Sequence, residues 1–262
     1  MRIGPSGEVG MRRWLMGMLV VLPLAGCAAG STGLGLNLVD LAQVDEEGVR
    51  AWQQLRAETP ASTDAQAQAR ARRVADRVLA GAGENPAQWE VEVFHSDQIN
   101  AFALPGNKIG VFEGMMRLAG SDDELAAVLG HEVGHNKAHH AAERMSTDAA
   151  AQLGVQVLSS VLGGGNSQMA AALLGAGAQY GIVLPYSRNQ ELQADQLGLD
   201  YMARAGFDPH AAIALWHKME KAAGGGPPTF LSTHPATGER IQGLEAHMPE
   251  AERAYRAATA GR

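Results

Sequence analysis

Two histidines and a glutamate in the middle of the chain have the spacing of metalloenzyme residues. His131, Glu132 and His135 follow the pattern His-Glu-x-x-His. Residues four apart lie on one face of a helix, so both imidazoles can reach one metal ion, and the glutamate projects beside them. Bound zinc lowers the pKa of its water towards about 7, and Glu132 can then take the proton. The alternative is a solvated helix face rich in histidine, because His139 and His140 follow closely.

A third ligand has to come from elsewhere in the chain, because a catalytic zinc site has three protein ligands and one open position. The best candidate is Glu191, with Asp195 one helical turn further on. Glu191 can bind the metal, while Asp195 accepts the second N–H of a ligating imidazole and fixes its tautomer. Glu-x-x-x-Asp pairs also occur on solvated helix faces, so this pair alone is weak evidence for a metal site. The histidine motif is what makes the assignment specific. Together the residues predict one Zn²⁺ per chain.

The histidine motif must be carried by a helix that begins near residue 121. Residues 121–124 are Ser-Asp-Asp-Glu, a capping box whose carboxylates complement the helix dipole. Apolar residues follow at three- and four-residue spacing, at positions 125, 128, 129 and 133. The pattern predicts a capped helix that continues past His135.

The elements around this helix indicate the fold class. Residues 64–79 have a helical pattern, and residues 89–94 alternate between apolar and acidic as a half-buried strand does. Residues 100–112 predict one or two further strands with a turn at Pro105-Gly106-Asn107, and residues 141–256 predict further helices. We therefore expect an α+β fold that is mostly helical, with a small β-sheet beside the metal helix.

In combination, these motifs resemble those of a family of zinc metallopeptidases, peptidase family M48, whose members include HtpX, the CAAX prenyl endopeptidase and BepA. The resemblance covers approximately residues 100–240. It comprises Asn-Ala-Phe-Ala-Leu-Pro-Gly at 100–106, the histidine motif, Ser187-Arg188 before Glu191 and Asp195, and Ser-Thr-His-Pro at 232–235 followed by Arg240. The chain looks most like the short, single-domain lipoprotein members, and the resemblance implies a zincin-like domain.

The resemblance also implies roles for residues outside the histidine motif. It implies that His131, His135 and Glu191 bind zinc and that Glu132 is the general base. The strand formed by Ala101, Phe102, Ala103 and Leu104 would pair with an extended substrate backbone. His234 and Arg240 would lie by the metal and stabilise the oxyanion. His234 has a second possible role, which is to close onto the zinc and hold the enzyme latent.

The function expected from these residues is peptide-bond hydrolysis by a zinc metalloendopeptidase. Its substrates would be unfolded or misassembled envelope proteins, in protein quality control. One alternative is a chaperone-like factor that keeps zinc but holds client proteins without cleaving them. Another is a zinc-stabilised structural module, which predicts four fixed ligands, including His234, and collapse on chelation.

The N-terminus has the pattern of a bacterial export signal. Arg12 and Arg13 precede a short apolar stretch that ends in Leu-Ala-Gly-Cys at 24–27. This ending resembles a lipobox, in which Cys27 is acylated and anchors the protein in a membrane; the alternative is an uncleaved anchor. Ala28 favours the outer membrane, facing the periplasm, and Met11 is a plausible start. We expect a signal peptide at 1–27, a tether and N-terminal segment at 28–60, and the metallopeptidase domain at 61–262.

Composition and charge narrow the choice of partners. The formal net charge is −7, and no cluster of Lys and Arg forms a basic face, which argues against nucleic acid. Residues 149–187 contain no charged residue, in two apolar runs that are each shorter than a membrane span. Either these runs are helices packed over the active site, where they would gate substrate entry, or they contact the membrane or an outer-membrane barrel protein.

Overall fold

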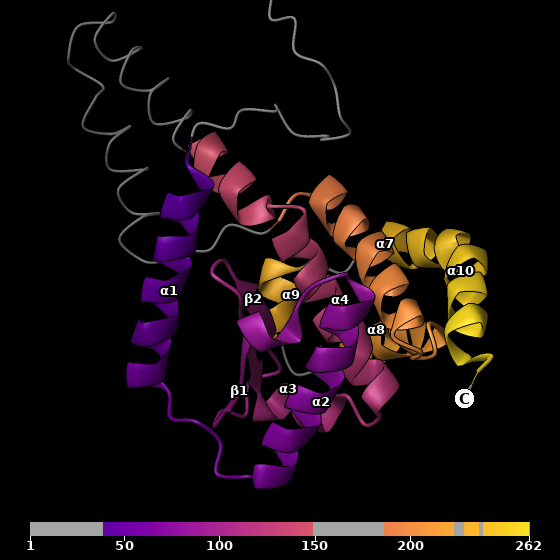
Figure 1. Ribbon diagram of the computed structural model, residues 1–262, viewed down its shortest axis with the longest axis horizontal. Coiled ribbons are helices and arrows are strands. Elements are labelled where there is room, and N and C mark those ends of the chain that lie inside the picture. Colours follow the sequence, from indigo (N-terminus) through magenta and orange to yellow (C-terminus); the bar gives the residue numbers. More distant parts are fainter. Residues whose placement is uncertain (1–38, 149–185, 223–227, 236–237, 262) are drawn as a thin grey trace, which may run out of the picture. The chain divides into compact units, whose positions relative to one another are not determined.

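The computed structural model describes residues 39–148, 186–222, 228–235 and 238–261 (Figure 1). In chain order the elements are α1 (Leu41–Glu58), α2 (Ala65–Gly81), the 3-10 turn η1 (Pro86–Gln88), β1 (Glu90–Phe94), β2 (Ala101–Leu104), β3 (Lys108–Phe112), α3 (Glu113–Leu118), α4 (Asp122–Lys137), α7 (Arg188–Arg204), α8 (His210–Ala222), α9 (Thr229–Thr233) and α10 (Gly238–Thr259). The expected fold class, mostly helical with a small sheet beside the metal helix, is confirmed.

The three strands form one sheet in the order β1-β3-β2. β1 pairs with β3 in parallel and β2 pairs with β3 antiparallel, with Ala103 opposite Ile109. Gly106 and Asn107 have positive φ angles of 76° and 64°, and they make the tight turn between β2 and β3. Among the described strands β2 has a neighbour on one side only. On its other edge the N–H of Ala103 donates a hydrogen bond to Glu132.

Each face of the sheet packs against different helices, because successive strand side chains point to opposite faces. Val93, Ile109 and Val111 belong to the main hydrophobic core, together with residues of α2, α4 and α7. On the opposite face, Phe94 and Phe112 pack with Trp52 of α1. The sheet therefore lies between α1 and the helices that carry the candidate site, as Figure 1 shows.

Helix α1 lies in the segment 28–60, for which the sequence predicts a tether and no particular element. Its buried positions, Val44, Gly48 and Trp52, recur every four residues along one narrow stripe. Gly48 is needed for the close approach to the β2–β3 turn, because a Cβ there would lie 2.2 Å from the carbonyl oxygen of Pro105. The side chain of Asp45 accepts a hydrogen bond from the N–H of Gly106 at 2.9 Å. Both contacts attach α1 to the end of β2.

Helices α4 and α7 cross with their backbones almost in contact. A Cβ on Gly130 would lie 2.6 Å from the carbonyl oxygen of Gly198, and a Cβ on Gly198 would lie 2.6 Å from the backbone nitrogen of His131. A Cβ on Gly134 would lie 2.8 Å from the carbonyl oxygen of Ala194. Three small residues therefore let the two helices approach closely enough to direct side chains at one point.

The ends of these helices are capped as their sequences suggest, with one difference. Ser121 accepts a hydrogen bond from the N–H of Glu124, but the carboxylate of Glu124 contacts Lys218 Nζ at 2.5 Å. The predicted capping box at α4 is therefore half formed, because a charged partner lies within reach of the glutamate. A reciprocal capping box is formed by Ser187 and Gln190 at the start of α7.

The expected signal peptide at 1–27, the start at Met11 and lipidation at Cys27 concern residues outside the described ones. So does the uncharged stretch 149–187, except its last two residues. In the part of the chain that the structure describes, no helix combines the length and the hydropathy that a membrane span requires.

Candidate metal centre

Four buried side chains from three parts of the chain converge on one point. His131 and His135 come from α4, Glu191 comes from α7, and His234 is the residue at which α9 ends. One ligand atom from each lies within 4.8 Å of every other. The Nε2 atoms of His131 and His135 are 3.1 Å apart, and His234 Nδ1 lies 3.2 Å from His131 Nε2. Glu191 Oε1 lies 3.0 Å from His234 Nδ1 and 3.4 Å from His135 Nε2.

These distances fit a tetrahedral metal site. With metal–nitrogen bonds of about 2.0–2.1 Å, two ligands of a tetrahedral zinc ion lie roughly 3.3 Å apart. The separations of 3.0–3.4 Å between the facing atoms match that spacing. Three imidazoles and one carboxylate are also donors that zinc accepts. The residues present therefore suit a small divalent cation held on four sides.

The protonation states of these groups also suit a cation. Burial lowers the pKa of His135 well below its ordinary value, so its imidazole is neutral. Burial acts against ionisation of Glu191, but the neighbouring His135, His234 and Arg240 outweigh it and hold the pKa of that carboxyl far below its ordinary value. Neutral nitrogen and ionised oxygen are the forms in which these side chains bind metals.

A second layer of buried charge surrounds the ligands. Asp195 Oδ1 lies 2.9 Å from His131 Nδ1, on the side of the ring away from the other ligands. Arg240, with 1% of its surface exposed, contacts Asp195 through Nε at 2.7 Å and Nη2 at 2.6 Å, and Glu191 through Nη1 at 2.6 Å. Its guanidinium also lies 3.9 Å above the ring of Trp216. All three nitrogens of Arg240 thus contact carboxylates, a geometry that favours positioning of Asp195 and Glu191 over the expected donation to an oxyanion.

Glu132 is buried between the ligands and the sheet. Its Oε2 accepts a hydrogen bond from the N–H of Ala103 at 3.2 Å. Its Oε1 lies 3.5 Å from His234 Nε2 and has no hydrogen-bond partner among the described residues. Burial raises the pKa of Glu132. A carboxylate with one free oxygen and a raised pKa, beside a metal site, has the properties of a general base.

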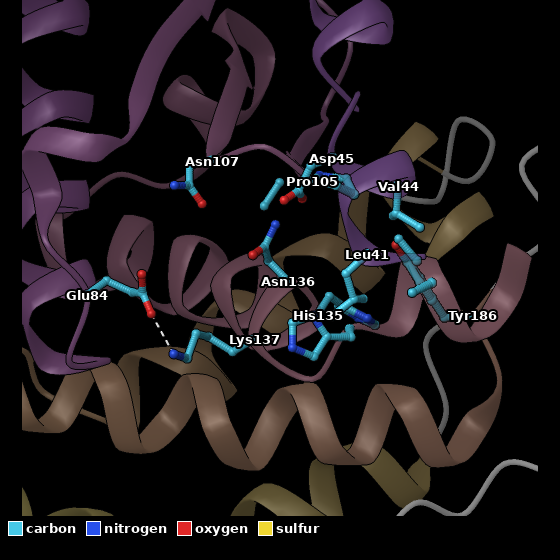
Figure 2. A pocket seen from close by; sticks show the side chains of 14 residues that line it. Leu41, Val44, Asp45, Glu84, Pro105, Asn107, His135, Asn136, Lys137 and Tyr186 are labelled. Atoms are coloured by element: carbon cyan, nitrogen blue, oxygen red, sulfur yellow. Dashed lines mark hydrogen bonds and ion pairs between the residues drawn. The ribbon is translucent and has the colours of Figure 1, made fainter. Parts of the chain in front are cut away.

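A cleft of about 220 Å³ opens beside His135 (Figure 2). The edge of β2 contributes Ala103 to its lining, and the following turn contributes Pro105. Of the expected substrate-binding residues, Ala101 and Ala103 face the main core, whereas Phe102 and Leu104 face α1.

Two contributors to the lining of this cleft, helix α1 and Tyr186, were not predicted from the sequence. Leu41 and Val44 bring α1 to its wall, and Figure 2 shows them near Tyr186, on the side of His135 away from the Glu84–Lys137 ion pair. The ring of Tyr186 lies 4.0 Å from that of His135 and 5.2 Å from that of His234. Two sequence features could have indicated them: the four-residue spacing of the buried residues in α1, and the position of Tyr186 directly before the N-cap residue Ser187.

The fold and the site together define a zincin-like metal-binding domain, in which a helix with His-Glu-x-x-His packs beside a small sheet. A model of Peptidase family M48 matches residues 63–248, which include α2, the sheet and all four converging side chains. The chain belongs to this family.

Relatives from yeast and from bacteria are similar in sequence to the chain. It is 40% identical over 182 residues to the mitochondrial metalloendopeptidase OMA1 of Schizosaccharomyces pombe, covering 69% of this chain and 52% of the relative. It is 30% identical over 246 residues to the beta-barrel assembly-enhancing protease of Yersinia pestis, covering 91% and 49%, and 30% identical over 228 residues to that of Escherichia coli, covering 84% and 45%. The chain thus spans about half the length of these relatives.

Proposed function

We propose that the protein is a zinc-dependent metalloendopeptidase. The observation that carries the proposal is the convergence of His131, His135 and Glu191, with the free oxygen of Glu132 beside them. Membership of Peptidase family M48 supports the same reaction class. When bound, zinc would supply Lewis acidity, which polarises a peptide carbonyl and lowers the pKa of water so that a base can deprotonate it near neutral pH.

Glu132 is the residue to which we assign the proton transfers. Its raised pKa and its buried, unpartnered Oε1 suit it to take a proton from the attacking water and to return it to the leaving amine. The hydrogen bond from Ala103 fixes the other oxygen, so that the carboxylate keeps one orientation.

His234 occupies the fourth side of the site and is assigned a latency role. Because its Nδ1 faces the same point as the three other ligand atoms, a metal held by all four residues has no open position for water. Movement of His234 away from this point would open that position.

The edge of β2 that pairs with no described strand is the site that we assign to the substrate backbone. An extended peptide that adds to this edge lies along the cleft lined by Ala103 and Pro105, next to His135. Main-chain pairing of this kind requires an unfolded segment, so the substrates are proteins with exposed extended chain.

The compartment is inferred from the N-terminal motif. The Leu-Ala-Gly-Cys ending at Cys27 supports a lipid anchor in the outer membrane, facing the periplasm. Two relatives are named for enhancing beta-barrel assembly, which supports misassembled envelope proteins as the substrate class. We extend that role to this chain as quality control of such proteins.

Casein digestion by the purified, zinc-loaded protein tests the proposal. Glu132→Gln should lower the rate by about 10²–10⁴-fold, because it removes the base and keeps the shape. It should leave one zinc per chain, as measured by atomic absorption. Zinc binding without casein cleavage in the wild type, with His234→Ala also inactive, would favour the chaperone-like alternative.

A further inference from the structure

His140 is a buried histidine that the proposed mechanism does not use. It is 1% exposed, and its Nδ1 lies 2.9 Å from Nδ1 of His135. Its Nε2 lies 3.1 Å from the side-chain oxygen of Gln193. His140 therefore joins the metal-facing helix α4 to helix α7 through two contacts, one at each ring nitrogen.

The backbone after α4 is shaped to bring this ring back to the site. α4 ends at Lys137, and the next residues make a turn in which His139 has a φ of 55°. A residue with a Cβ rarely adopts this left-handed conformation, and strain of this kind is maintained where the surrounding structure requires it. The turn interrupts the helical path at His139, and the ring of His140 lies against that of His135.

The chemistry of the three side chains determines where the hydrogens are. With the Gln193 amide oriented so that its oxygen faces His140, that oxygen can only accept, and this orientation places a hydrogen on Nε2 of His140. In neutral His140 the other nitrogen, Nδ1, is then an acceptor. Its neighbour at 2.9 Å, Nδ1 of His135, must be the donor, which leaves Nε2 of His135 with a free lone pair. That nitrogen is the one that faces the other metal ligands.

We propose that Gln193 and His140 form a neutral relay that holds His135 in the tautomer with hydrogen on Nδ1, so that its Nε2 is always available to the metal. His140 and Gln193 are positioning residues: they act through His135 and not on the substrate. The inference rests on the ligand role proposed for His135.

The relay completes a pattern in which helix α7 orients both histidines of α4. Asp195 contacts Nδ1 of His131 directly, at 2.9 Å. Gln193, two residues earlier, reaches Nδ1 of His135 through the ring of His140. One orienting partner is thus an anion and the other is neutral. A second buried anion would add to the charge of Glu191 and Asp195, whereas the amide orients without adding charge.

Two substitutions remove the relay at different points. His140→Phe keeps a flat buried ring but provides no acceptor, and Gln193→Leu keeps the approximate size but removes the oxygen that selects the tautomer. We expect the zinc Kd, measured by competition with a chromophoric chelator, to rise about 10–100-fold in His140→Phe. The rise in Gln193→Leu should be smaller, because His140 can still adopt the correct tautomer part of the time. His247→Phe is the matched control, since His247 is a partly buried histidine of α10 that pairs with Asp200 of α7 at 2.9 Å and contacts no residue of the site.

A direct readout of the tautomer separates positioning from general stability. Long-range ¹H–¹⁵N spectra of the zinc-free protein should show hydrogen on Nδ1 of His135 and on Nε2 of His140. In Gln193→Leu, His135 should become a mixture of tautomers at an unchanged Tm. Hydrogen on Nε2 of His135 in the wild type, or wild-type zinc Kd in both variants, would overturn the proposal. If His140→Phe does not fold, the zinc Kd of Gln193→Leu and the wild-type spectrum still test the proposed relay.

These measurements do not depend on proteolysis. A wild-type protein that binds zinc with the expected tautomers but does not cleave casein would contradict the proposed function and would still support the relay. Conversely, an active protease whose zinc affinity is unchanged in both His140→Phe and Gln193→Leu would contradict the relay alone.

Discussion

Asp195 contacts both His131 and Arg240, and Arg240 also contacts Glu191, so the buried charges of the centre form one connected chain. Burial opposes ionisation of Asp195, but hydrogen bonds from Arg240 and His131 outweigh it and hold the pKa of its carboxyl below the ordinary value. The stacking of Arg240 on Trp216 fixes the guanidinium in this position. Asp195, Glu191 and Arg240 each thus have a partner of opposite charge, and removal of one leaves another unbalanced.

Asp195→Asn tests this balance at the scale of one residue. The substitution keeps the shape but removes the charge that pairs with Arg240 and orients His131. We expect the zinc Kd to rise about 10-fold, and urea unfolding to show a stability loss on the order of 3 kcal/mol, because a buried arginine loses one of its two anions. Asp200→Asn on the same helix should leave the Kd unchanged and cost less than about 1 kcal/mol, since its partners Arg204 and His247 both keep contact with solvent. Equal effects from both variants would contradict the assignment.

At the scale of elements, the crossing of α4 and α7 sets the geometry of the site. The two helices supply His131, His135 and Glu191, and the ligand atoms meet because Gly130, Gly134 and Gly198 let the backbones nearly touch. A larger residue at the crossing would separate the helices and the ligands with them. The same crossing places Asp195 and Gln193 within reach of the histidine rings.

Gly198→Ala tests the crossing. The new Cβ would lie 2.6 Å from the backbone nitrogen of His131, and backbone cannot move aside as a flexible side chain can. We expect a stability loss of about 1–3 kcal/mol in urea unfolding, together with weaker zinc binding. Gly238→Ala, at the first residue of α10, is the control, because a Cβ there meets nothing within 4 Å and alanine favours the helix. A Gly198→Ala protein as stable as the wild type would show that the glycine contact is not required.

At the scale of the whole molecule, much of the fold could be predicted from local patterns. The spacing around His131 and His135 predicted α4, and alternation predicted β1, because both periodicities belong to elements with one buried face. The turn residues at 105–107 predicted one or two strands where β2 and β3 lie. Helix α1 was missed because its buried stripe, Val44, Gly48 and Trp52, is narrow and includes a glycine.

The parts of the site that could not be predicted from the sequence are those that depend on contacts made only in the folded chain. His140 follows the histidine motif closely, but its contact with His135 requires the left-handed turn at His139, which no periodicity indicates. The role of Arg240 could not be read from its type, because a guanidinium can face a substrate or pair with buried carboxylates. Its burial against Asp195 and Glu191 is a property of the folded chain.

Removal of the metal tests whether the whole domain depends on it. The main core joins the sheet with α2, α4, α7, α8 and α10 through apolar contacts that involve no ligand. Most of the folding free energy should therefore persist without zinc. Zinc at 1,000 times its Kd adds about 4 kcal/mol by linkage. For a domain of this size EDTA should then lower the Tm by about 10 °C, while the helical circular dichroism at 25 °C stays unchanged and added zinc restores the Tm.

The opposite outcome would change the interpretation of His234. If chelation unfolds the protein at 25 °C, the four converging side chains act as a structural site, and His234 is a permanent ligand. His234→Ala separates the two cases further. A latent enzyme should gain casein cleavage when this ligand is removed, provided that His131, His135 and Glu191 retain the metal, because a position opens for water. A structural site should instead lose both zinc and stability in this variant.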